Sequence, residues 1–135
     1  LLPCLQQGFS VTPSPTSPLT EIAIFAEQLA LEAGELIARE RNENRLRTDY
    51  KAQTELVTHA DLMADELITR AIQARYPDHR ILSEESMPDL QQASHLETPL
   101  WIIDPIDGTV NYAYGHPASA ISVARFRSGW FTPPL

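Results

Sequence analysis

The stretch LWIIDPIDGTVN, residues 100–111, places two aspartates directly behind an apolar run. Residues 100–103 have the length and composition of a buried strand. Asp104 and Asp107 follow it, separated by a proline that stiffens the backbone, and Gly108 allows another group to approach the main chain closely. Taken alone, this motif is also typical of a plain turn. Together with a second acidic pair earlier in the chain, it indicates a strand end where negative charge is concentrated.

That second pair, Glu84 and Glu85, follows another strand-sized apolar run at residues 80–83. If the two strands are neighbours in one sheet and their carboxyl ends converge, Glu84 lies close to Asp104. Carboxylates held this close repel one another, and a divalent cation removes that penalty. Oxygen ligands favour hard cations, and Mg²⁺ combines a few carboxylates with water and substrate phosphate. The two motifs together predict a magnesium site, whereas the glutamate pair alone is also typical of a solvated loop.

An anion site is expected beside this cation site. If a helix begins near Asp107, the free N–H groups of Gly108 and Thr109 face outward at its positive end. The carbonyl of Ile106 is in place to join the two aspartates as a ligand. Metal ligands next to a phosphate site are what metal-assisted hydrolysis of a phosphate ester requires.

Two amphipathic helices are expected before the strands. Ser17 is a favoured N-cap in front of a proline, and apolar residues then recur at a period near 3.6 up to about Arg41. A second helix is predicted to begin at Thr58, which forms a capping box with Asp61, and to end at Pro77.

The remaining segments are expected to be strands and loops. Residues 42–56 are polar and mixed in charge, and they predict a loop or a short hairpin. Strand-sized apolar runs lie at residues 80–83, 100–103 and 119–124, and a polar loop spans residues 87–99. Helices followed by strands indicate an α+β fold in which two helices pack on an antiparallel sheet.

Composition limits the classes of function. The chain has 135 residues, enough for one small domain, and its hydrophobic fraction of 43% is that of a globular protein. A formal net charge of −8 argues against a nucleic-acid partner, because phosphate backbones attract Lys and Arg. No apolar stretch reaches the roughly 20 residues that span a bilayer, so a cytoplasmic protein without a membrane partner is expected. Residues 1–17 are rich in Pro, Ser and Thr and predict a disordered tail before a domain over residues 18–135.

Three motifs, in order, resemble the inositol monophosphatase family of Mg²⁺-dependent, lithium-sensitive sugar-phosphate phosphatases. They are ELVTHADLMADELI at residues 55–68, ILSEES at residues 81–86 and WIIDPIDGTVNYAYGHP at residues 101–117. The resemblance implies the N-terminal part of a layered sugar-phosphatase fold. It also implies hydrolysis of a small phosphorylated polyol, above all inositol monophosphate, by an activated water without a covalent enzyme intermediate.

The same resemblance implies roles for the acidic residues. Glu84, Asp104 and Asp107 would bind Mg²⁺ through their side chains, and Ile106 would bind it through its carbonyl. Glu85 would then be a supporting residue rather than a ligand.

A catalytic group is implied as well. Thr109, hydrogen-bonded to Asp61, would hold and polarise the attacking water together with Glu84. The backbone N–H groups of Gly108 and Thr109 would bind the substrate phosphate.

Departures from the family pattern keep other functions open. Ser83 stands where the family usually has a glycine, and the Trp-Asp motif that normally supplies a further metal ligand does not follow Asn111. An inactive fragment or interaction protein that keeps a weak cation site is therefore one alternative. Another sugar-phosphate or nucleotide phosphatase of the same superfamily is a second. The open edge expected for so small a sheet also leaves room for a homodimer.

Overall fold

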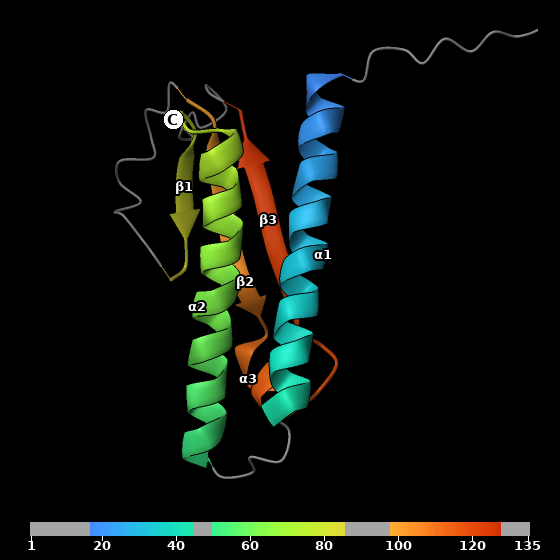
Figure 1. Ribbon diagram of the computed structural model, residues 1–135, viewed down its shortest axis with the longest axis vertical. Coiled ribbons are helices and arrows are strands. Elements are labelled where there is room, and N and C mark those ends of the chain that lie inside the picture. Colours follow the sequence, from blue (N-terminus) through green and yellow to red (C-terminus); the bar gives the residue numbers. More distant parts are fainter. Residues whose placement is uncertain (1–16, 45–49, 86–97, 128–135) are drawn as a thin grey trace, which may run out of the picture.

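The computed structural model describes residues 17–44, 50–85 and 98–127, which form two long helices, a short third helix and a sheet (Figure 1). Both long helices lie side by side against the same face of the sheet and run in opposite directions (Figure 1). No helix within the described ranges is both long enough and apolar enough to cross a membrane. The elements, in chain order, are α1 (Pro18–Asn44), α2 (Tyr50–Arg75), β1 (Arg80–Ser83), β2 (Leu100–Asp107), α3 (Thr109–Ala113) and β3 (Ala120–Phe126).

The start of α1 confirms the predicted cap. The Ser17 hydroxyl accepts a hydrogen bond from the Thr20 backbone N–H at 3.3 Å, and the Ser17 carbonyl accepts one from the Glu21 N–H at 3.1 Å. Pro18 occupies the first helical position, where its missing N–H costs nothing. Of the disordered tail predicted over residues 1–17, residues 1–16 lie outside the described residues, and Ser17 caps α1.

The loop or hairpin predicted over residues 42–56 is wrong where the structure describes that segment. Residues 42–44 continue α1 and residues 50–56 belong to α2, while residues 45–49 lie outside the described part. The capping box at Thr58 is wrong for the same reason, because Thr58 lies inside α2 and its hydroxyl donates to the Thr54 carbonyl at 3.0 Å. The first two turns of this helix consist mainly of polar residues with good helix propensity, so no apolar pattern marked them as helical.

The sheet has the strand order β1-β2-β3 and is mixed rather than antiparallel. β2 and β3 are antiparallel, as predicted, but β1 pairs with β2 in parallel, with Ser83 opposite Ile103. A parallel pair needs a long crossover connection instead of a tight hairpin. Residues 86–97 of that connection, which include most of the polar loop predicted over residues 87–99, lie outside the described residues. The α+β class itself is confirmed.

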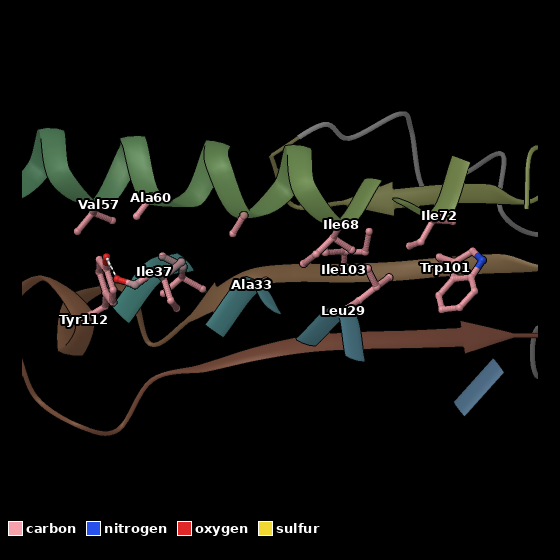
Figure 2. Close-up of a cluster of buried hydrophobic side chains, with 12 residues drawn as sticks. Leu29, Ala33, Ile37, Val57, Ala60, Ile68, Ile72, Trp101, Ile103 and Tyr112 are labelled. Carbon is pink, nitrogen blue, oxygen red and sulfur yellow. Dashed lines mark hydrogen bonds between the residues drawn. The ribbon is translucent and has the colours of Figure 1, made fainter. Parts of the chain in front are cut away.

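The hydrophobic core lies between the helices and the sheet. Figure 2 shows Val57, Ala60, Ile68 and Ile72 of α2 facing the layer that contains Trp101. Trp101 is fully buried and makes an edge contact with Phe25 of α1. The core side chains are Leu29, Ala33, Ile37, Val57, Ala60, Ala64, Ile68, Ile72, Trp101, Ile103, Ile106 and Tyr112.

His79 is the polar partner of this core. The indole N–H of Trp101 donates to Nδ1 of His79 at 3.0 Å, and the His79 ring stacks on Tyr76. Burial, followed by the nearby positive charge of Arg125, lowers the pKa of His79 below its ordinary value. The imidazole is therefore held in the neutral form that can accept the indole proton.

Tyr112 connects α3 to the C-terminal part of α1. Its ring is 1% exposed, and its hydroxyl donates to the Ile37 carbonyl at 2.8 Å (Figure 2). Burial raises the pKa of Tyr112 to about 12, so the phenol remains a donor throughout the neutral range. The hydrogen bond fixes the segment that follows the second aspartate.

Replacing Tyr112 by Phe should lower the free energy of unfolding by about 1 kcal/mol, because it removes this hydrogen bond and keeps the ring. Urea denaturation measures the change. Tyr114→Phe is the matched control, since Tyr114 is 65% exposed, and it should shift stability by less than about 0.5 kcal/mol. Equal effects of the two substitutions would contradict the anchoring role of Tyr112.

Candidate acidic site at the carboxyl end of the sheet

Parallel pairing brings two predicted ligands together. Because β1 and β2 run in the same direction and in register, Glu84 and Asp104 follow the paired residues Ser83 and Ile103. The Glu84 backbone N–H donates to the Ile103 carbonyl at 3.3 Å, which extends the ladder by one residue. The two carboxylates predicted to meet at this edge therefore do meet.

The charge of Asp104 affects the protonation of Glu84. The negative charge of Asp104 is the main cause that raises the pKa of Glu84, and a hydrogen bond to the Asp104 carboxyl group adds to it. One oxygen of Asp104, Oδ1, is buried and has no hydrogen-bond partner among the described atoms. A buried carboxylate oxygen without a donor is costly, and a cation is the group that would satisfy it.

Asp61 extends this acidic region from α2. It is 8% exposed, and burial is the main cause that raises its pKa to about 7. The negative charges of Glu85, Glu84 and Asp104 raise it further. Asp61 thus lies within electrostatic reach of the pair.

The turn after β2 is shaped by glycine. Gly108 has φ 83°, and a Cβ there would lie 2.8 Å from the Ala118 carbonyl oxygen. The Asn111 side-chain amide donates to that same oxygen at 2.8 Å, so the segment before β3 packs closely on this turn. α3 begins at Thr109, slightly later than predicted, and has only five residues.

The Thr109 hydroxyl makes a different hydrogen bond from the one expected with Asp61. Its hydroxyl donates to the Ile106 carbonyl at 3.1 Å. Asp61 and Thr109 both line a cavity of about 330 Å³ between α2 and α3, whose other walls include Val57 and Val110. Thr109 therefore already contacts the carbonyl that was predicted to be a ligand.

Asp107 is exposed and lines a separate hollow with Gly108 and Asn111. Its charge contributes to the raised pKa of Glu84, so it belongs to the same acidic region. Within residues 17–44, 50–85 and 98–127, no three His, Cys, Asp or Glu side chains are gathered into a ready set of metal ligands. The structure brings Glu84 and Asp104 together and leaves Asp107 at the margin.

The sequence analysis missed Asp65. It lies one helical turn after Asp61, and the buried hydroxyl of Ser83 donates to its Oδ1. The four-residue spacing of the two aspartates is the signal that places both on one face of α2.

Comparison with known proteins identifies the setting of this site. The sequence profile described as the inositol monophosphatase family matches residues 18–130. The protein qutG of Emericella nidulans is 38% identical over 116 residues, which are 82% of this chain and 35% of that protein. Human inositol monophosphatase 2 is 35% identical over 106 residues, which are 78% of this chain and 37% of that protein.

Solved structures of inositol monophosphatases also match this chain. Inositol monophosphatase II from Staphylococcus aureus has a TM-score of 0.68 at 30% identity, covering 81% of this chain and 39% of its own. SaIMPase-II with bound inositol monophosphate matches at TM-score 0.65 and 31% identity, over 82% of this chain and 37% of that one. A third structure holds the same enzyme with 2′-AMP, at TM-score 0.64 and 28% identity, over 81% and 38% of the two chains. This chain thus spans less than half the length of these relatives.

The raised pKa of Asp61 makes stability depend on pH. A folded-state pKa of about 7, above the ordinary 3.8, means that the folded form binds the proton more tightly. The resulting stabilisation is complete at low pH and is lost as pH rises through 7. With a chelator present, raising the pH from about 5.5 to about 8 should lower the free energy of unfolding by about 1 kcal/mol, allowing for solvent screening.

Urea denaturation at both pH values tests this. Asp61→Asn should remove most of the difference, and Glu35→Gln, on the exposed side of α1, should leave it in place. A pH dependence that survives in Asp61→Asn would show that another group is responsible.

Proposed function

The chain belongs to the inositol monophosphatase family, and from that premise we propose that its acidic site is the metal-binding part of a centre that hydrolyses phosphate monoesters. The observation that carries the proposal is the pair Glu84 and Asp104, held together by parallel strands with a buried, unpartnered oxygen on Asp104. Such a pair is unfavourable by itself and becomes favourable when a cation binds.

Mg²⁺ fits this set of donors, which contains only oxygen. Glu84, Asp104 and Asp107 would hold it through their side chains, and Ile106 through its carbonyl. When bound, Mg²⁺ neutralises the carboxylates and polarises a phosphoryl oxygen.

The remaining residues would act on water and substrate. Thr109 orients the attacking water together with Glu84, and Asp61 accepts a proton through the Thr109 hydroxyl. The shared cavity of Asp61 and Thr109 supports this, and so does a pKa of about 7 for Asp61, which suits a group that exchanges protons near neutrality. In the proposed active arrangement the Thr109 hydroxyl turns from the Ile106 carbonyl toward Asp61. The N–H groups of Gly108 and Thr109 contact the phosphate.

A small phosphorylated polyol is the proposed substrate, with inositol monophosphate first. The related structure with bound inositol monophosphate supports this choice. The complex of the same enzyme with 2′-AMP favours a nucleotide phosphatase as the second candidate. Because the chain covers 35% of qutG and 37% of the human enzyme, a cation-binding part without full activity is the alternative. A cytoplasmic location, sensitivity to lithium and a homodimer belong to the same proposal.

Asp104→Asn should weaken Mg²⁺ binding by about a hundredfold or more, because it removes the charge of a carboxylate that has one buried oxygen. Isothermal titration calorimetry with Mg²⁺ measures this. Glu35→Gln removes one negative charge from the exposed side of α1 and serves as the matched control, with an affinity close to that of the unaltered chain. Equal affinities for Asp104→Asn and the unaltered chain would refute the proposed metal site.

Turnover by this 135-residue chain should be at least about a thousandfold below that of a full-length relative. The matched residues cover 37% of the length of human inositol monophosphatase 2, and each 1.36 kcal/mol of lost transition-state stabilisation costs about tenfold in rate. Phosphate release from inositol monophosphate and from 2′-AMP measures the rate and ranks the two substrates. A rate near that of the relative would show that the chain carries a complete active site.

A further inference from the structure

Ser83 is a buried polar residue at the end of β1. Its side chain is 1% exposed, yet its hydroxyl makes two hydrogen bonds. It donates to Oδ1 of Asp65 on α2, and it accepts from the Glu85 backbone N–H at 3.4 Å. These contacts join the last residue of the strand both to a helix and to the turn that follows.

The turn carries Glu84. Its own N–H is held by the Ile103 carbonyl of β2, the residue just before Asp104. Hydrogen bonds therefore fix the main chain on both sides of Glu84. The Glu84 N–H is bound to β2, and the Glu85 N–H is bound to the Ser83 hydroxyl. Without the hydroxyl, the side of the turn that faces α2 loses its attachment to the helix.

The electrostatics of the pair make this attachment necessary. Glu84 and Asp104 follow paired residues of neighbouring strands, so their like charges oppose this arrangement when no cation is bound. β1 has four residues and, among the described strands, pairs with β2 alone. So short a strand does little by itself to hold the turn beside β2. The hydrogen bond from Ser83 to Asp65 on α2 adds to that hold.

We infer that Ser83 and Asp65 are positioning residues, which hold Glu84 beside Asp104 and so prepare the cation site before the metal arrives. The inference rests on the proposed function, because it assigns a purpose to the same pair of carboxylates. Its physical content is preorganisation: a site whose ligands are already in place loses less conformational entropy when it binds.

Calorimetric titration of the full chain with Mg²⁺ alone tests the inference. Ser83→Ala changes no charge and should weaken Mg²⁺ binding about tenfold, the size expected for one lost hydrogen bond to a carboxylate. Ser83→Thr keeps the hydroxyl and should restore the affinity to within about threefold of the unaltered chain.

Asp65 is tested through a double-mutant cycle, because removing its charge alone also weakens the attraction for a cation. In the Asp65→Asn background, Ser83→Ala should cost clearly less than the tenfold loss seen in the unaltered background. Equal losses in both backgrounds would show that the hydroxyl does not act through Asp65 and would overturn that part of the inference.

Thr69→Ala is the matched control. The Thr69 hydroxyl donates to the backbone carbonyl of Asp65 at 2.8 Å, so the variant removes a hydroxyl contact at the same residue without touching the turn. It should alter the urea midpoint and leave Mg²⁺ affinity unchanged. Ser83→Ala should instead alter the affinity at a temperature where circular dichroism shows the chain folded.

The outcomes separate the inference from the proposed function. If the unaltered chain binds Mg²⁺ and Asp104→Asn abolishes binding, while Ser83→Ala keeps full affinity, the positioning role is wrong and the metal site stands. If the unaltered chain shows no saturable Mg²⁺ binding, the proposed function falls and the inference falls with it. If Ser83→Ala does not fold, Ser83→Thr decides: a folded Thr variant with a tenfold loss of affinity overturns the inference.

Discussion

Parallel pairing between β1 and β2 is the constraint on which the acidic site depends. In a parallel pair both carboxyl ends lie at the same edge, so the residues that follow Ser83 and Ile103 become neighbours. An antiparallel pair in the same positions would put Glu84 and Asp104 at opposite ends of the sheet. The two long helices cover one face of this sheet, and their packing against Trp101 and Ile103 keeps the strands in register (Figure 2).

The same constraint costs stability. Glu84, Asp104 and the buried Asp61 all lie in one region. The charge of Asp104 raises the pKa of Glu84, and the pKa of Asp61 is raised mainly by burial and further by the neighbouring carboxylates. Folded proteins accept such local conflicts where a ligand later relieves them, and the surrounding core compensates. Here the compensation comes from apolar contacts between α2 and β2 and from the hydrogen bonds of Ser83 and Tyr112.

Much of this arrangement could be predicted from the sequence, and each wrong prediction has a specific physical reason. The cap at Ser17 and the strand before Asp104 depend on local chemistry, so local patterns predicted them. The direction of β1 relative to β2 depends on pairing between residues far apart in the sequence, which no local periodicity encodes. The first two turns of α2 are polar and carry no apolar stripe, and Thr58 therefore looked like a cap. Asp65 escaped notice because its partner, Ser83, is 18 positions away.

The hydrogen bond from Tyr112 to Ile37 spans 75 positions of the chain, and this separation has a kinetic consequence. Closing so long a loop is entropically expensive, and contacts of this kind form after the local ones. The helical hairpin of α1 and α2 can assemble early, whereas the turn at Gly108 and the short α3 reach their final positions late. The turn that carries the second aspartate is thus expected to reach its final packing only after the layer between the helices and the sheet has formed.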